Sequence, residues 1–211
     1  MKAHTSETQA TITPEKALEF LKEGNERFVK NLKMNRNLLE QVNDTREGQW
    51  PFAVILSCID SRTSAELIFD QGLGDIFSIR IAGNFVNRDI LGSMEFGCKI
   101  AGSKLIVVLG HSKCGALKGG LDAAAVQELG MDNLNQLIYH FDSCIQEVIH
   151  EGEERSSKNE NLLERLNICN IRRTIEDIRN QSHTLKTMEE KGEIKIVGAN
   201  YCVESGTVNW I

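Results

Sequence analysis

The sequence predicts an α/β fold with three layers, in which helices cover both faces of a mostly parallel four-stranded sheet that ends in an edge hairpin. The first observation is a set of short apolar runs without alternation, such as residues 53–57 and 104–109, which are typical of strands buried on both faces of a parallel sheet. The second is that helical segments separate these runs, as in parallel βαβ units. The third is a turn-like segment, residues 204–207, whose position before residues 208–210 predicts the hairpin.

The N-terminal region is predicted to be helical and polar. Residues 1–12 are polar and are expected to be loose. Thr13 places a hydroxyl at a helix N-cap and Pro14 occupies the first helical position, so an amphipathic helix begins there and ends near Lys30. A shorter helix is predicted around residues 37–43.

The remaining elements alternate along the chain. Strands are predicted at residues 53–57, 75–79, 104–109 and 194–199, and helices at residues 63–69, 90–101, 134–148 and 162–178. Residues 151–160 are charged and are expected to form a solvated connection. We expect the 211 residues to form a single domain, with an N-terminal helical arm in residues 1–50 and the α/β core in residues 51–211.

Composition excludes several classes of partner. A net charge of -6 and a pI near 5.5 predict no basic face, so we expect no binding to nucleic acid or to an anionic membrane. No apolar run approaches the roughly 20 residues that cross a bilayer, and the first residues lack the apolar segment of a secretory signal, so we expect a cytoplasmic protein. The six cysteines are dispersed, which disfavours a disulfide framework, and Cys98, Cys144 and Cys169 are expected as buried apolar side chains.

Three possible metal ligands follow two of the predicted strands. Cys58 comes directly after the first strand, and His111 and Cys114 come directly after residues 104–109. The carboxyl ends of parallel strands meet at one edge of a sheet, so these side chains can converge although the motifs lie far apart in the sequence. Two thiolates and one imidazole suit zinc, and three protein ligands leave a fourth position open, as in catalytic zinc sites.

Asp60 and Arg62 stand beside the first of these ligands and can form a bidentate ion pair. If they pair, Asp60 stays off the metal and can accept a hydrogen bond from a zinc-bound hydroxide, which would orient the nucleophile. If the pair breaks, Asp60 could take the fourth position, and the site would be closed. A structural zinc site with four protein ligands and a loop salt bridge without chemistry both stay open. A thiol redox couple is disfavoured because there is no Cys-x-x-Cys motif.

At these residues the sequence closely resembles the β-class carbonic anhydrases. The resemblance rests on the motifs Cys58-x-Asp60-Ser61-Arg62 and His111-x-x-Cys114-Gly115, with supporting matches at residues 24–28, 80–84 and 198–201. Thr63 departs from the family pattern, in which many members have an apolar residue such as Val after the motif arginine.

The resemblance implies one zinc ion per chain, held by Cys58, His111 and Cys114, and an Asp60–Arg62 dyad. It implies reversible hydration of carbon dioxide to bicarbonate and a proton by zinc-hydroxide attack. Gln49 matches a family glutamine that donates a hydrogen bond to the substrate. The resemblance also implies a homodimer or a dimer of dimers, with the N-terminal helix on the neighbouring subunit. A carbon disulfide or carbonyl sulfide hydrolase on the same fold and a non-enzymatic zinc-binding interaction module remain as alternatives.

Overall fold

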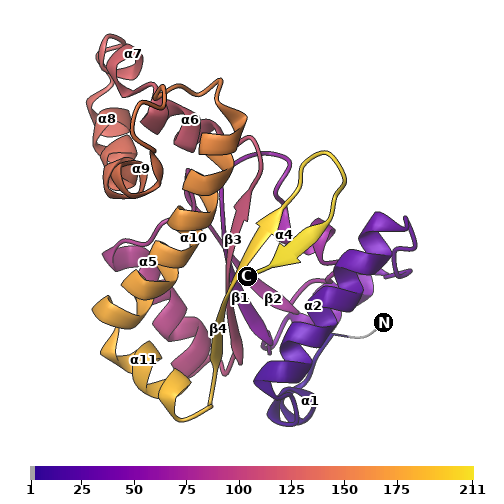
Figure 1. The fold of residues 1–211 in the computed structure, drawn as a ribbon. Coiled ribbons are helices and arrows are strands. Elements are labelled where there is room, and N and C mark those ends of the chain that lie inside the picture. Colours follow the sequence, from indigo (N-terminus) through magenta and orange to yellow (C-terminus); the bar gives the residue numbers. More distant parts are fainter. Residues whose placement is uncertain (1–2) are drawn as a thin grey trace.

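A single mixed sheet forms the centre of the protein, as seen in the computed structural model, which describes residues 3–211 (Figure 1). The strand order is β2-β1-β3-β4-β5, and the first four strands are parallel while β5 runs antiparallel to β4. The strands are β1 (Ala53–Ser57), β2 (Ile76–Arg80), β3 (Leu105–His111), β4 (Lys195–Tyr201) and β5 (Val208–Trp210). The predicted fold class, four parallel strands with an edge hairpin, is confirmed.

The burial of the central strands explains why they could be predicted from the sequence. Every residue of β1 and of β3 is buried, because helices cover both faces of the sheet at these two central positions. β2 lies at the edge, and its exposed Ser78 and Arg80 alternate with less exposed apolar residues. In the register of the sheet, Ser57 pairs with Arg80 on one side and with Leu109 on the other, so β1 and β2 end together and β3 runs on to His111.

Helices form the two outer layers and an additional lobe (Figure 1). On one face of the sheet α2 packs through Ala17 and Leu21 against Ile55 and Val107, and on the other face α10 packs through Ile171 against Val108. The lobe gathers around Phe141 beyond the carboxyl ends of the strands. The helices are α1 (Ser6–Ala10), α2 (Pro14–Val29), α3 (Leu38–Thr45), α4 (Ala65–Ile68), α5 (Arg88–Glu95), α6 (Gly115–Leu121), α7 (Ala123–Gln127), α8 (Asp132–Ile138), α9 (Asp142–Val148), α10 (Glu160–Gln181) and α11 (His183–Glu190).

The N-terminal region differs from the expectation at residues 6–10. Residues 6–10 form α1, because the buried Gln9 amide donates hydrogen bonds to the backbone carbonyls of Pro51 and Ala101, each at 2.8 Å. Met1 and Lys2, also expected to be loose, lie outside the described residues. α2 packs on the sheet of its own chain, and the contact with a neighbouring subunit that the resemblance implies stays a prediction.

Three helices also differ from their predicted bounds. The segment from residue 134 to 148 is broken by the 3-10 turn η2 (Tyr139–Phe141), and residues 90–101 close in the π-helical turn η1 (Phe96–Ile100). The helix predicted at residues 63–69 is reduced to α4, because the Thr63 hydroxyl bonds backwards to the preceding turn. In the part of the chain that the structure describes, no helix is long and apolar enough to cross a membrane. All six cysteines are free, and Cys98, Cys144 and Cys169 are buried as expected.

Candidate metal centre

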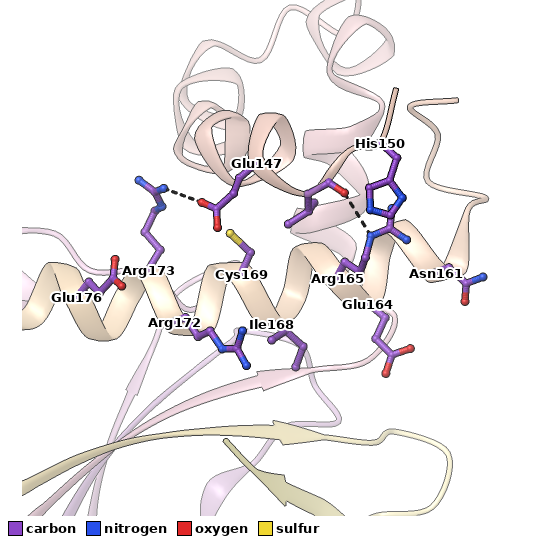
Figure 2. A pocket seen from close by; sticks show the side chains of 11 residues that line it. Glu147, His150, Asn161, Glu164, Arg165, Ile168, Cys169, Arg172, Arg173 and Glu176 are labelled. Carbon is purple, nitrogen blue, oxygen red and sulfur yellow. Dashed lines mark hydrogen bonds and ion pairs between the residues drawn. The ribbon is translucent and has the colours of Figure 1, made fainter. Parts of the chain in front are cut away.

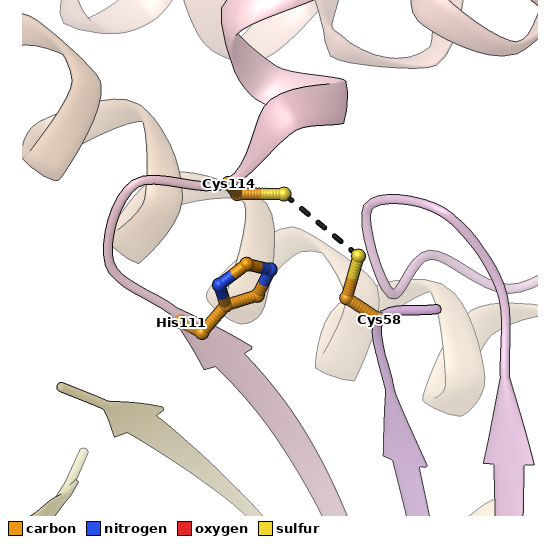
Figure 3. A group of neighbouring side chains, drawn as sticks. All are labelled: Cys58, His111 and Cys114. Atoms are coloured by element: carbon orange, nitrogen blue, oxygen red, sulfur yellow. Dashed lines mark hydrogen bonds between the residues drawn. The ribbon is translucent and has the colours of Figure 1, made fainter. Parts of the chain in front are cut away.

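The three predicted ligands meet at the carboxyl end of the sheet. Cys58 follows β1, His111 is the last residue of β3, and Cys114 is the N-cap of α6. Their ligand atoms all lie within 4.8 Å of one another, and the two sulfur atoms are 4.0 Å apart (Figure 3). Lys113 adopts a left-handed backbone conformation, with φ of 58°, which turns the chain sharply enough to bring Cys114 back toward His111.

The geometry of this group fits zinc. Two thiolates on a tetrahedral zinc ion, with Zn–S bonds of about 2.3 Å, lie about 3.8 Å apart. The Nδ1 atom of His111 lies 2.9 Å from the Ser112 carbonyl oxygen, which can only accept, so Nδ1 carries the ring hydrogen and Nε2 carries a lone pair. Nε2 is buried and has no hydrogen-bond partner among residues 3–211. A metal ion would satisfy this acceptor and take the place of the hydrogen bond between the two cysteine sulfur atoms.

The surroundings favour the thiolate form of Cys58. A hydrogen bond from Cys114 lowers the pKa of Cys58 to about 4, and the same contact raises the pKa of Cys114. The Gly83 N–H donates to the Cys58 sulfur at 3.4 Å. Gly83 has φ of 79°, and a Cβ here would lie 2.3 Å from the Phe141 ring, so only glycine allows this approach. The Asn170 amide of α10 fixes the same loop by donating to the Gly83 carbonyl at 2.8 Å.

Asp60 and Arg62 form the bidentate ion pair that their spacing allows. Arg62 Nε donates to Oδ1 at 2.9 Å and Nη2 donates to Oδ2 at 2.8 Å, while the Arg62 backbone N–H donates to Oδ1 at 3.0 Å. The Asp60 side chain is 16% exposed and that of Arg62 is 49% exposed. The guanidinium holds the pKa of Asp60 well below its usual range. Within residues 3–211, the group of mutually close ligand atoms does not include Asp60, so its carboxylate stands beside the metal centre and outside it.

Two residues outside the predicted site hold the turn between Cys58 and Asp60. The Thr63 hydroxyl lies 3.0 Å from the Cys58 carbonyl oxygen and 2.9 Å from that of Asp60. Arg80, at the end of β2, donates from Nε to the Cys58 carbonyl at 3.0 Å and from Nη2 to the Asp60 carbonyl at 2.6 Å. The sequence signal for Thr63 was its departure from the family pattern, and the signal for Arg80 was the family match at residues 80–84.

Gln49 lies at the opposite end of the sheet. It is exposed and lines a surface hollow together with Thr45, Leu73 and Gly74, just before β2 begins. From this end, the five residues of β1 lead to Cys58. A strand of that length spans about 16 Å. Within one chain, Gln49 is therefore not brought to the metal centre.

Two larger cavities lie near α10. The first, of about 730 Å³, runs along the outer side of the helix and is lined by Glu147, Glu164, Glu176, Arg165, Arg172 and Arg173, among others (Figure 2). Because its carboxylates and guanidinium groups balance, it shows no preference for a charged ligand. The second, of about 600 Å³, lies beside His111 and is lined by Lys113, Asn167, Asn200 and Cys202, among others. It adjoins the metal centre on the imidazole side.

Comparison with known proteins identifies the family of this arrangement. A family model described as carbonic anhydrase matches residues 53–208. Carbonic anhydrase 2 of Mycobacterium tuberculosis is 46% identical over 111 residues, which are 52% of this chain and 54% of that protein. The carbonic anhydrase of Synechococcus elongatus is 31% identical over 182 residues, which are 82% of this chain and 64% of that protein. The first of these matches thus spans only about half of the relative's length.

Solved structures agree with the family match. The β-carbonic anhydrase CcaA superposes with a TM-score of 0.70 at 25% identity, covering 93% of both chains. A Coccomyxa β-carbonic anhydrase in complex with acetazolamide superposes with a TM-score of 0.67 at 21% identity, covering 80% of this chain and 75% of that one, and supports the fold alone. The family match over most of the chain, together with the Cys-His-Cys group at the end of the parallel sheet, shows that this chain belongs to the β-carbonic anhydrase family.

Proposed function

We propose that this protein catalyses the reversible hydration of carbon dioxide to bicarbonate and a proton. The observation that carries the proposal is the buried group of Cys58, His111 and Cys114, with its unpartnered imidazole nitrogen, beside an Asp60–Arg62 pair that stands off the metal position. The family match supports the same reaction.

The three ligands would hold the zinc ion that this family uses. When bound, zinc supplies Lewis-acid chemistry, activating a water molecule for attack on carbon dioxide. Cys58 and Cys114 contribute two negative charges and His111 none, which matches the charge of Zn²⁺. Burial of all three side chains keeps competing water away from the thiolates. The Ser112 carbonyl keeps the imidazole in the tautomer that presents Nε2.

Asp60 is proposed to orient the attacking water. Arg62 keeps the carboxylate ionised through the neutral pH range, so Asp60 acts as a hydrogen-bond acceptor and does not store the proton. Oδ1 accepts hydrogen bonds from the Arg62 Nε and from the Arg62 backbone N–H, whereas Oδ2 accepts one hydrogen bond, from Nη2, and retains a further lone pair. That remaining lone pair can accept a hydrogen bond from the water, which fixes the direction of the attacking oxygen.

We also propose that the active form is a homodimer or a dimer of dimers. Gln49 is too far from the metal centre of its own chain to contact the substrate, so the role that the resemblance implies for it requires a second copy. One solved relative, from Sordaria macrospora, is described as tetrameric, and at 20% identity it shows the fold alone. The cytoplasmic location remains a prediction from the sequence.

The deciding experiment measures zinc per chain and, on the same sample, carbon dioxide hydration by stopped flow from about pH 6.5 to 9, where a metal-bound water titrates. One zinc per chain with hydration that rises toward alkaline pH supports the proposal. One zinc without hydration at any pH would reject it. Carbonyl sulfide and carbon disulfide, assayed in parallel, would then separate a sulfur-compound hydrolase from a zinc-binding module.

A further inference from the structure

The turn that carries both a zinc ligand and the dyad carboxylate is held by its carbonyl groups. Cys58 and Asp60 are separated by one residue, and their carbonyl oxygens both face the Thr63 hydroxyl and the Arg80 guanidinium. Thr63 is fully buried, whereas Arg80 reaches the turn from the exposed edge of β2. The two donors therefore approach the turn from a buried and from an exposed position.

The Thr63 hydroxyl is free to donate its hydrogen to the Cys58 carbonyl, because other donors already occupy the Asp60 carbonyl. The Asp60 carbonyl already accepts from the Thr63 backbone N–H at 2.9 Å and from Arg80 at 2.6 Å, which uses its two lone pairs. A hydroxyl has a single hydrogen, so that of Thr63 is available to the Cys58 carbonyl at 3.0 Å. Arg80 supplies the second donor to the same carbonyl.

The hydroxyl does not serve the helix that follows. The N-cap of α4 is Ser64, which makes no side-chain capping hydrogen bond, and the Thr63 hydroxyl faces back toward Cys58. A valine in its place would fill the same space without the donor. The contact is therefore directed at the turn and adds nothing to the first turn of the helix.

We propose that Thr63 and Arg80 are positioning residues that jointly fix the Cys58–Asp60 turn. By holding the two carbonyls, they set the direction of the Cys58 thiolate toward the metal and of the Asp60 carboxylate toward the attacking water. The second half of this inference rests on the proposed hydration reaction. The first half concerns zinc binding alone and can be tested without carbon dioxide.

The test compares Thr63→Val, Thr63→Ser, Arg80→Gln and the double variant Thr63→Val/Arg80→Gln in the full chain. Thr174→Val is the matched control, because Thr174 is a buried threonine on α10. The first readout is the rate at which zinc passes to a chromophoric chelator. The second is kcat and KM for carbon dioxide hydration.

Loss of one hydrogen bond at this carbonyl is expected to speed zinc release by about threefold to tenfold in Thr63→Val. The same variant should lower kcat with KM unchanged, because the turn contributes geometry and no substrate contact. Thr63→Ser retains the donor and should stay within about twofold of the wild type. The double variant leaves the Cys58 carbonyl without a side-chain donor, so its effect should exceed the product of the single effects.

Three results would overturn the proposal. The first is that Thr63→Val releases zinc at the rate of the wild type or of Thr174→Val. The second is that Thr63→Ser releases zinc as fast as Thr63→Val does. The third is a double variant whose effect equals the product of its parts, since the two groups would then act independently. If Thr63→Val does not fold, the zinc release rate of Arg80→Gln tests the proposal, because this substitution changes an exposed side chain. Release at the wild-type rate would then overturn the proposal. A protein that binds zinc but hydrates nothing would refute the proposed function while leaving the zinc-release test valid.

Discussion

A methyl group added at Gly110 has no room between β3 and α10. A Cβ at this position would lie 2.6 Å from Asn167 Oδ1 and 2.6 Å from Ile171 Cδ1. Favourable contacts of carbon atoms lie at about 3.5–4.0 Å, so either the helix or the end of the strand must move. Asn167 is tied to Asn200 by a hydrogen bond of 2.9 Å, and Ile171 is fully buried, so neither side chain can turn away freely.

The expected cost of Gly110→Ala follows from this crowding. Overpacking costs about 1–3 kcal/mol. Replacement of glycine stabilises the folded protein by about 0.4–1 kcal/mol, because it lowers the conformational entropy of the unfolded chain. We expect the free energy of unfolding of the zinc-free protein to fall by about 1–2 kcal/mol. Because His111 is the next residue, displacement of the strand end should also weaken zinc binding about tenfold. This lowers the free energy of unfolding of the zinc-loaded protein by a further ~1.4 kcal/mol.

Gly198→Ala is the matched control, because it crowds the same helix at a point further from the ligands. A Cβ at Gly198 would lie 2.7 Å from Ile171 Cγ2, and this residue pairs with Val108, three positions before His111. We expect a similar loss of stability with unchanged zinc affinity. Urea unfolding of zinc-free and zinc-loaded samples, with chelator competition, measures both quantities. Equal loss of zinc affinity in the two variants, or wild-type stability in Gly110→Ala, would refute the reasoning.

Three further predictions test the ligands, the dyad and an ion pair remote from both. Cys58→Ser should lose zinc, measured by metal analysis, whereas Cys98→Ser, at a buried site away from the metal, should retain zinc. A Cys58→Ser variant that still holds one zinc per chain would show that Cys58 is not a ligand. Asp60→Asn should keep zinc and lose kcat by about 10²-fold or more in stopped flow, and full activity would make the pair structural. Arg165 lowers the pKa of Glu153 to about 2, so the pair stabilises the fold above the ordinary value of 4.5 and this contribution is lost as pH falls toward 2. The stability difference between wild type and Glu153→Gln, followed by circular dichroism, should therefore shrink over that range, and a constant difference would contradict it.

The fold and the meeting of the three ligands could be predicted because both depend on the central strands. β1 and β3 are buried on both faces, so they appear in the sequence as uninterrupted apolar runs. Adjacent parallel strands end at the same edge, which places Cys58 and His111 together whatever the details of the loops. The Asp60–Arg62 contact was equally accessible, because two residues in one turn need no tertiary information to meet.

Features that depend on tertiary contacts could not be predicted from the sequence. The polar segment around Gln9 looks loose until its amide is seen bonding Pro51 and Ala101, which are far away in the chain. The distance between Gln49 and the metal centre follows from its place at the amino end of β1, whereas the resemblance considered only its spacing from Cys58 in the sequence. Arg80 belongs to the family match at residues 80–84, but the sequence does not reveal which carbonyl groups an exposed arginine at a strand end contacts.

Helix α10 links the core to the metal centre. Its apolar spacing predicted a core helix correctly, but the same buried face carries Asn167 and Asn170, which are costly to bury without partners. The side-chain N–H groups of both find partners at the carboxyl end of the sheet: Asn167 donates to Asn200, and Asn170 donates to the loop whose Gly83 N–H contacts the Cys58 sulfur. The Oδ1 atom of Asn167 has no partner among residues 3–211. On the same helix, Ile171 packs against Gly110, directly before His111. Residues three and four apart on a helix share one face, so a shift of this single helix would disturb two zinc ligands at once.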